Sequence, residues 1–229
     1  MDYIVKCAYC GGTYIVNSKG NNAHFSCNKC GALNGTEDII ETSTLQSQAK
    51  MDKTEEDVHF EYYLKAAEQG DVKAQYKVAV YYDEGKGVAQ DLEKAAVWYT
   101  KAAEQGHASA QYNLGNSYYH GEGVKRDETT AVSWYRKAAD QGHAKAQFMM
   151  GVCYDKGLGV VNDEEEAVRW YRKAAEQGHA KAQFNLGNSY YKGEGIEKDM
   201  TEAARWYAKA AEQGHEKAQA KLIKYGLDL

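Results

Sequence analysis

Beyond about residue 60, apolar residues recur with the period of an α-helix. Ala74, Val78 and Tyr82 lie at i, i+4 and i+8, and this spacing predicts a first helix of about 14 residues. Gly85 and Gly87 then interrupt the pattern, because each glycine makes continued helix less stable by about 1 kcal/mol. A second apolar stripe follows them, at Ala95, Trp98, Tyr99, Ala102 and Ala103. The pattern therefore predicts two helices joined by a short turn.

This helix pair recurs every 36 residues. The period is marked by five glycines, Gly70, Gly106, Gly142, Gly178 and Gly214, and by all four tryptophans, Trp98, Trp134, Trp170 and Trp206. A period of about 20–50 residues is typical of a solenoid, in which each unit buries its apolar face against its neighbours. We therefore predict a mainly α fold, an α/α superhelical solenoid. Because Trp134 lies in the middle of the array, we expect its truncation to destabilise the fold more than that of Trp206.

The ends of the predicted helices carry recurring polar residues. Four aspartates stand where the second helix needs an N-cap: Asp91, Asp127, Asp163 and Asp199. Asp163 with Glu166, and Asp199 with Glu202, also have the D-x-x-E spacing of a capping box. Four histidines follow the period glycines: His107, His143, His179 and His215. We interpret these histidines as residues of the N-terminal helical turns, since side chains one repeat apart are too distant to share a metal ion.

Four of the five cysteines lie within the first 30 residues. Cys7, Cys10, Cys27 and Cys30 form the pattern C-x2-C-x16-C-x2-C, which is typical of a zinc ribbon. Residues 13–16 and 23–26 read as two strands between the pairs. We predict a zinc ribbon over residues 1–36 with one structural zinc ion, because so small a domain cannot bury enough surface to fold alone. Two disulfides, an iron site or a dithiol redox pair remain alternatives.

Residues 37–54 differ from both flanking regions, being polar and rich in acidic side chains. We predict that they form an acidic linker. The formal net charge of the whole chain is −5, which gives no general reason to expect nucleic acid as a partner. No run approaches the roughly 20 apolar residues of a membrane span, and no secretory signal is recognised at the N-terminus. We expect a cytoplasmic protein.

The second full unit carries a recognisable motif, Ala110-Gln111-Tyr112-x-Leu114-Gly115-x-x-Tyr118-x-x-Gly121-x-Gly123-Val124-x-x-Asp127, followed by Ala131-x-x-Trp134-Tyr135-x-Lys137-Ala138-Ala139. This motif resembles the Sel-one-like repeat, a relative of the tetratricopeptide repeat. The solenoid is then expected over residues 55–229. It divides into a half-repeat at 55–70, four repeats at 71–106, 107–142, 143–178 and 179–214, and a C-terminal cap at 215–229. The resemblance implies a non-catalytic adaptor whose concave surface, lined by first helices, binds a peptide or protein.

One stripe of the first helices is the predicted partner-binding groove. Its residues are Lys73, Lys77, Asn113, Asn116, His120, Lys145, Met149, Lys156, Lys181, Asn185, Asn188, Lys192 and Lys221. The excess of lysine predicts a partner that is acidic or ends in a free C-terminal carboxylate, with the asparagine amides bonding to its backbone. The alternative is that these lysines and asparagines are ordinary solvated surface residues.

No set of nucleophile, base and acid recurs with fixed spacing, so we expect no catalytic residues. The fifth cysteine, Cys153, occupies a position where other copies have serine, and we interpret it as a small buried side chain. A second functional hypothesis is a nucleic-acid-linked regulator whose ribbon docks DNA or RNA. The ribbon itself has little net charge once zinc and four thiolates are counted, which makes nucleic acid the less favoured partner.

Overall fold

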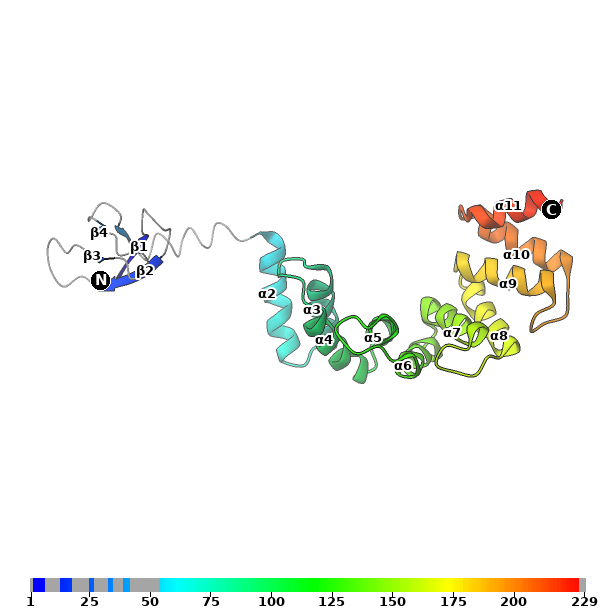
Figure 1. The fold of residues 1–229 in the computed structure, drawn as a ribbon, viewed down its shortest axis with the longest axis horizontal. Helices are drawn as coiled ribbons and strands as arrows, with labels where there is room; N and C mark the ends of the chain where they lie inside the picture. Colours follow the sequence, from blue (N-terminus) through cyan, green and yellow to red (C-terminus); the bar gives the residue numbers. More distant parts are fainter. Residues whose placement is uncertain are drawn as a thin grey trace. The chain divides into compact units, whose positions relative to one another are not determined.

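The structure, a computed structural model, describes residues 2–6, 13–17, 25–26, 33–34, 39–41 and 54–226 (Figure 1). The chain divides into two compact units, residues 1–58 and 59–229. The first unit contains short strands, and the second contains a succession of helices. Each unit is considered by itself.

In the described residues of the first unit, five strands form two small antiparallel sheets. Strands β1 (Asp2–Lys6), β2 (Thr13–Asn17) and β5 (Ile39–Glu41) form a sheet in the order β2-β1-β5. Strands β3 (Phe25–Ser26) and β4 (Leu33–Asn34) pair with each other. The strand at 13–16 is confirmed. Strand β3 covers only the second half of the other predicted strand, and its partner is β4.

The predicted linker also contains regular structure. Its apolar residues Ile39 and Ile40 belong to β5 and pair with Val5 and Ile4 of β1. The excess of acidic residues obscured this short apolar run in the sequence. The predicted zinc ligands Cys7, Cys10, Cys27 and Cys30 lie outside the described residues.

Ten helices follow one another in the described part of the second unit (Figure 1). Their bounds are α2 (Glu55–Glu68), α3 (Val72–Glu84), α4 (Leu92–Glu104), α5 (Ala108–His120), α6 (Glu128–Asp140), α7 (Ala144–Lys156), α8 (Glu164–Glu176), α9 (Ala180–Lys192), α10 (Met200–Glu212) and α11 (Glu216–Tyr225). We call α3, α5, α7, α9 and α11 the first helices, and α4, α6, α8 and α10 the second helices. From α3 onward each helix packs against the one before it and the one after it, so the prediction of a helical solenoid is confirmed.

The predicted helix ends are largely correct. Each of the four aspartates caps a second helix, and the Asp163 carboxylate accepts the backbone N–H of Glu166 at 2.9 Å. The second bond of a capping box, in which Glu166 would accept the backbone N–H of Asp163, does not form, however. The backbone N–H of Asp163 donates to the carbonyl of Tyr154 at 3.0 Å, while Glu166 accepts a bond from Arg169 at 3.0 Å. In the same way, the backbone N–H of Asp199 donates to the carbonyl of Tyr190, and Glu202 accepts a bond from Arg205.

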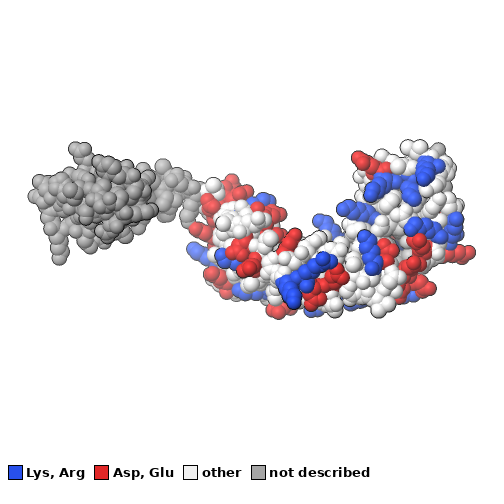
Figure 2. Space-filling model, in the orientation of Figure 1, with Lys and Arg blue, Asp and Glu red and all other residues white. Residues whose placement is uncertain are grey.

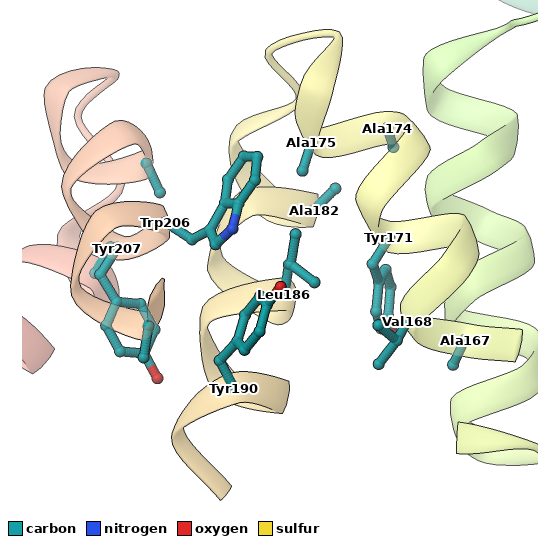
Figure 3. Packing of buried hydrophobic residues seen from close by; sticks show 13 residues of the cluster. Ala167, Val168, Tyr171, Ala174, Ala175, Ala182, Leu186, Tyr190, Trp206 and Tyr207 are labelled. Carbon is teal, nitrogen blue, oxygen red and sulfur yellow. The ribbon is translucent and has the colours of Figure 1, made fainter. Parts of the chain in front are cut away.

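The core of the solenoid pairs large side chains with small ones. Figure 3 shows Trp206 of α10 beside Ala175 of α8 and Leu186 of α9. The side chain of Trp170 is 3% exposed and that of Trp206 is 7% exposed, whereas Trp134 is only half-buried. The expectation that Trp134 is the more critical tryptophan is therefore wrong. Trp206 is buried although it lies near the C-terminal end of the array, because it packs against side chains of the preceding repeat, as Trp170 does.

Buried glutamines connect successive repeats. Gln147 of α7 donates from Nε2 to the carbonyl of Ala139 at the end of α6 (3.1 Å). Its Oε1 accepts a bond from Gln177, just after α8, at 2.7 Å. Gln75, Gln111 and Gln183 make the equivalent pair of bonds in their own repeats. Each of these glutamines thus ties together three consecutive helices.

Candidate functional site

Shallow hollows line the first helices, at the boundaries between repeats. One, of about 250 Å³, is bordered by Tyr76, Tyr112, Asn113, His143 and Lys145. The next, of about 470 Å³, is bordered by Tyr112, Lys145, Phe148, Met149, His179 and Lys181. A third, of about 510 Å³, is bordered by Phe148, Lys181, Phe184, Asn185, His215 and Lys217, and also by the carboxylate side chain of Glu216. Each hollow therefore has the same elements: aromatic rings, one histidine and at least one lysine.

The aromatic rings and histidines are stacked in pairs. Tyr112 stacks on His143 with 5.0 Å between ring centroids, and Phe148 stacks on His179 at 4.7 Å. The same pair occurs at Tyr76 with His107 and at Phe184 with His215. Each aromatic ring also lies near a tyrosine of the following second helix, at a longer centroid distance than the histidine, for example Phe148 to Tyr171 at 6.0 Å. Each aromatic ring in a hollow is therefore packed between a histidine and a tyrosine.

The histidines are N-caps, which confirms their interpretation as residues of the N-terminal turns. The Nδ1 atom of His143 accepts the backbone N–H of Ala146 at 3.3 Å, and His179 accepts that of Ala182 at 3.2 Å. A nitrogen that accepts carries no proton, so the neutral ring has its proton on Nε2. Burial, and then the nearby Lys145 and Lys181, lower the pKa values of His143 and His179 below the usual value. Both rings are therefore neutral at pH 7.

Lysines beside the hollows carry the charge of this surface. Lys145, Lys181 and Lys217 are exposed at matching positions near the starts of α7, α9 and α11. Figure 2 shows Lys and Arg gathered over α9 and α11, whereas Asp and Glu are more abundant over α2 and α3. The positive charge therefore lies toward the C-terminal repeats.

The predicted groove asparagines are half-buried and already hydrogen-bonded within the solenoid. Asn113 donates to the hydroxyl of Tyr99 at 3.0 Å, and Asn185 bonds to the hydroxyl of Tyr171. The side-chain oxygens of Asn116 and Asn188 each accept a tyrosine hydroxyl at 2.8 Å, from Tyr135 and Tyr207 respectively. These asparagines position the second-helix tyrosines, and only Asn113 and Asn185 also border a hollow.

The other predicted groove residues fall into two groups. Lys145, Met149, Lys181 and Lys221 border hollows, with Lys221 in one shared by Phe184 and Tyr225. Lys73 and Lys77 are exposed on α3, and His120, Lys156 and Lys192 are exposed at the last positions of α5, α7 and α9. Lys192 forms an ion pair with Glu194 at 2.9 Å. The single predicted stripe is therefore divided between the hollows, the exposed surface of α3 and the C-termini of α5, α7 and α9.

The sequence reasoning missed the aromatic residues of the hollows. Tyr76, Tyr112, Phe148 and Phe184 recur every 36 residues, so the signal was present. They stand one position before residues 77, 113, 149 and 185 of the predicted stripe, so a stripe set by the helical angle from Ala74, Val78 and Tyr82 passed over them. These half-buried rings form the apolar sides of the hollows, which exposed lysines do not form by themselves.

Metal-ligating, thiol and membrane-spanning features contribute little to the described part of the chain. Among those residues, no group of three or more His, Cys, Asp or Glu side chains is arranged to hold a metal ion. Cys153 is fully buried, as expected, and burial raises the pKa of its thiol to about 12. Within the same residues, no helix has the length and apolarity needed to cross a bilayer. The recurring hollows are thus the feature on which a functional argument rests.

Comparison with known proteins identifies the repeat. The Sel1 repeat profile matches residues 60–71, 72–107, 108–143, 144–179 and 180–215. The chain belongs to the Sel1 repeat family. Sel1 repeat proteins generally mediate protein–protein interactions, and their fold is typically a non-catalytic scaffold.

Two solved structures illustrate the relationship of this Sel1 repeat chain to others. One is a protective antigen of uropathogenic Escherichia coli that displays an SLR fold, with 38% identity and a TM-score of 0.70 over 73% of the chain and 37% of the antigen. The other is a Sel1 repeat protein from Oxalobacter formigenes, with 37% identity and a TM-score of 0.69 over 76% and 70% of the two chains. The chain therefore spans little more than a third of the antigen's length. No match was found among curated proteins.

Proposed function

We propose that this Sel1 repeat chain is a non-catalytic adaptor whose first helices bind an acidic segment, or a free C-terminal carboxylate, of a protein partner. A hollow between first helices accepts a side chain or a chain end, and its lysine attracts negative charge. The neutral histidine adds a hydrogen-bond donor at Nε2.

The distribution of charge between the two sets of helices supports this proposal. The five first helices carry nine lysines and four carboxylates, and seven of the lysines but only two of the carboxylates, Asp155 and Glu216, lie on α7, α9 and α11. The second helices carry nine basic against ten acidic residues, so they have almost no net charge. A positive surface in a chain of net charge −5 is most simply explained by an acidic partner.

A direct test measures the binding of a fluorescein-labelled oligoglutamate peptide by fluorescence anisotropy. We expect saturable binding that weakens as salt rises, because the Debye length falls from about 10 Å at 0.1 M to about 3 Å at 1 M. An oligolysine peptide of equal length serves as the control. Equal binding of both peptides, or no binding of oligoglutamate, would contradict the proposal.

Charge reversal locates the binding surface. Lys181→Glu and Lys217→Glu should weaken binding of the oligoglutamate peptide, since both lysines border a hollow. Lys137 and Lys173 on the second helices are poor controls, because their Nζ atoms lie 3.8 and 4.0 Å from the ring centres of Trp134 and Trp170. Lys125, exposed in the turn before α6, is a better control. If Lys125→Glu weakens binding as much as the other two, the partner does not bind the first helices.

The zinc ion stays a separate proposal, supported by the spacing of Cys7, Cys10, Cys27 and Cys30. These four thiolates would complete a tetrahedral structural site, and the ribbon would provide a second contact or a tether for the adaptor. Protein purified without added metal should contain about one equivalent of zinc per chain by elemental analysis. Four freely titrating thiols in the folded protein would contradict this assignment. The cytoplasmic location likewise stays a prediction.

A further inference from the structure

We propose that the two ends of the solenoid are complementary, so that α2 of one copy fits α11 of a second copy, and that two large side chains, His59 and Ile223, prevent this head-to-tail contact. The contact would lie at the ends of the array and does not involve the hollows of the proposed function. Removal of the two side chains should therefore convert a monomer into a chain of copies.

The two terminal helices are unmatched halves of one repeat. Helix α11 is a first helix, and no second helix follows it in the described chain. Helix α2 has the sequence of a second helix, with Tyr62 at the tryptophan position and Gly70 at the period glycine, and no first helix precedes it among the described residues. The face of α2 that would contact a first helix is exposed: Tyr62 is 68% exposed, whereas Trp206 at the matching position is 7% exposed.

A recurring hydrogen bond of the inner repeats is available across the two ends. In each complete repeat, a glutamine just after the second helix donates from Nε2 to the Oε1 atom of a glutamine on the first helix, as Gln213 does to Gln183 at 2.7 Å. Gln69 occupies the donor position after α2, and Gln219 of α11 occupies the acceptor position. Both are exposed, so α2 of a second copy would supply the donor that Gln219 lacks a helix for.

The charges of the two terminal helices are opposite. Helix α2 carries five acidic residues and one lysine, whereas α11 carries three lysines and one glutamate. Figure 2 shows the same contrast, with Asp and Glu more abundant over α2 and Lys over α11. Opposite charges attract α2 of one copy to α11 of another, while two copies of the same helix repel each other. Charge therefore favours a head-to-tail contact over a symmetric one.

The residues at the closest approach of two paired helices oppose the contact. A Cβ atom on Gly187 of α9 would lie 2.8 Å from the ring of Tyr207 and 3.3 Å from the carbonyl oxygen of Ala203, both on α10. In the four complete repeats, the positions of Gly187 and Ala203 hold only glycine or alanine. At the ends, the matching residues are Ile223 on α11 and His59 on α2. Side chains of that size would overlap the facing helix, so the ends do not pack as an inner pair does.

A head-to-tail contact between identical chains does not stop at two copies. It extends into a filament unless its rotation closes a ring, so a block at the ends keeps the chain monomeric. Ile223 is 80% exposed and His59 is also exposed. Both can therefore be replaced by alanine without opening a cavity in the core.

The test is sedimentation velocity of the full chain at concentrations up to about 1 mM, since a contact between single helices belongs to the weak class of interfaces. The variants are His59→Ala, Ile223→Ala and their combination, which reproduces the Ala79 and Ala95 pair of α3 and α4. We expect the unchanged chain and each single variant alone to be monomeric. A mixture of the two single variants should form a dimer of twice the 25.5 kDa mass and grow no further, because each copy offers one open end. The double variant should form larger species as its concentration rises.

The other results would each overturn the proposal. Self-association of the unchanged chain would show that His59 and Ile223 do not block the ends. A double variant that stayed monomeric would show that the ends are not complementary. Dimers of Ile223→Ala alone would indicate a symmetric contact between α11 helices. The control replaces Val97 and Val161, exposed apolar residues away from both ends, with alanine and should stay monomeric. Circular dichroism verifies that each variant is folded.

Discussion

Individual residues in this solenoid are constrained by their counterparts in the neighbouring helix. The glycine in the middle of a first helix and the tyrosine of the following second helix form one such pair, at Gly115, Gly151 and Gly187. A Cβ atom on Gly151 would lie 2.5 Å from the ring of Tyr171. That ring is fixed, because Tyr171 is buried and its hydroxyl donates to Asp155 at 3.3 Å.

Gly151→Ala should therefore destabilise the chain. Alanine in a helix normally adds about 1 kcal/mol relative to glycine, but forcing a methyl group into a packed core costs about 1–3 kcal/mol. We expect a lower midpoint in urea unfolding followed by circular dichroism. The reverse change at the matching position of the first repeat, Ala79→Gly, serves as a control, since it creates no clash. A higher midpoint for Gly151→Ala would show that Tyr171 is free to move.

A second residue-scale prediction concerns the buried glutamines. Gln147→Leu keeps the approximate size of the side chain but removes two hydrogen bonds, to Ala139 and from Gln177, while the Ala139 carbonyl keeps the backbone N–H of Gly142 at 2.9 Å. We expect a loss of about 1–3 kcal/mol in the free energy of unfolding. Gln219→Leu is the matched control, because Gln219 makes the equivalent bond to Ala211 from an exposed position. Equal losses at the two positions would show that burial does not matter.

The sequence was most informative about residues whose type already limits their role. Gly85 and Asp91 were assigned correctly because few residues fit a left-handed helix end or an N-cap. The internal hydrogen bonds of the groove asparagines were not predicted, since the sequence does not reveal which tyrosine hydroxyl an amide contacts. The depth of Trp206 was also missed, because burial depends on the preceding repeat rather than on local sequence.

At the scale of single elements, the first helices differ in how they begin. Helix α3 is capped by Asp71, whose carboxylate accepts the backbone N–H of Ala74 at 2.7 Å. The helices α5, α7, α9 and α11 use histidine at the same position. A protonated histidine has no free acceptor, so these four caps function only with a neutral ring.

The histidine caps should make stability depend on pH. The pKa values of His107, His143 and His179 are lowered in the fold, mainly by burial, so the unfolded chain binds protons more readily. Stability is then fully present above the unfolded pKa of about 6.5 and decreases as pH falls through it toward the folded values. We expect the melting temperature to decrease between about pH 7 and pH 5.

The double variant His143→Asn and His179→Asn isolates this effect. Asparagine is a good N-cap that does not titrate in this range, so the variant should remain folded and lose part of the pH dependence. Acidic residues elsewhere titrate equally in both proteins, and the difference between the two melting profiles therefore reports the histidines. Superimposable profiles would contradict the role given to the caps.

Whole elements were predicted more reliably than their connections. The helices followed from a strong period and from breakers at both ends, as α3 between Asp71 and Gly85 illustrates. Strand β5 was missed because three residues are too few to establish a period within an acidic stretch. The hollows were missed for a different reason: each is formed by residues about 36 apart, and only the packing of the helices brings them together.

At the scale of the whole solenoid, the same glutamine-to-carbonyl hydrogen bond recurs at each junction between one repeat and the next. A solenoid is stabilised by contacts between neighbouring repeats, so its stability is close to a sum over the repeats and the junctions between them. Deletion of residues 108–143 removes α5 and α6 and joins His107 directly to Ala144. In the shortened chain His107 caps the helix that begins at Ala144, and Gln147 faces the carbonyl of Ala103 in place of that of Ala139.

We expect the shortened chain to remain folded with a lower melting temperature, because it loses one repeat and one junction. The control deletes residues 108–126, which removes only α5, so that the second helix α4 is followed directly by another second helix, α6. Circular dichroism should show a cooperative transition for the first deletion and loss of structure for the second. If both remain equally stable, the junction bonds do not determine the order of the repeats.

The uniformity of the junctions has a consequence for the gene. Recombination between two misaligned copies of a tandem repeat adds or removes one complete unit, and the new boundary inherits a glutamine and a capping residue that already fit. The number of repeats is therefore free to vary by single events without compensating substitutions. Because the hollows recur with the repeat, every such event adds or removes one hollow, so that the length of the binding surface changes through copy number while point mutation changes its chemistry.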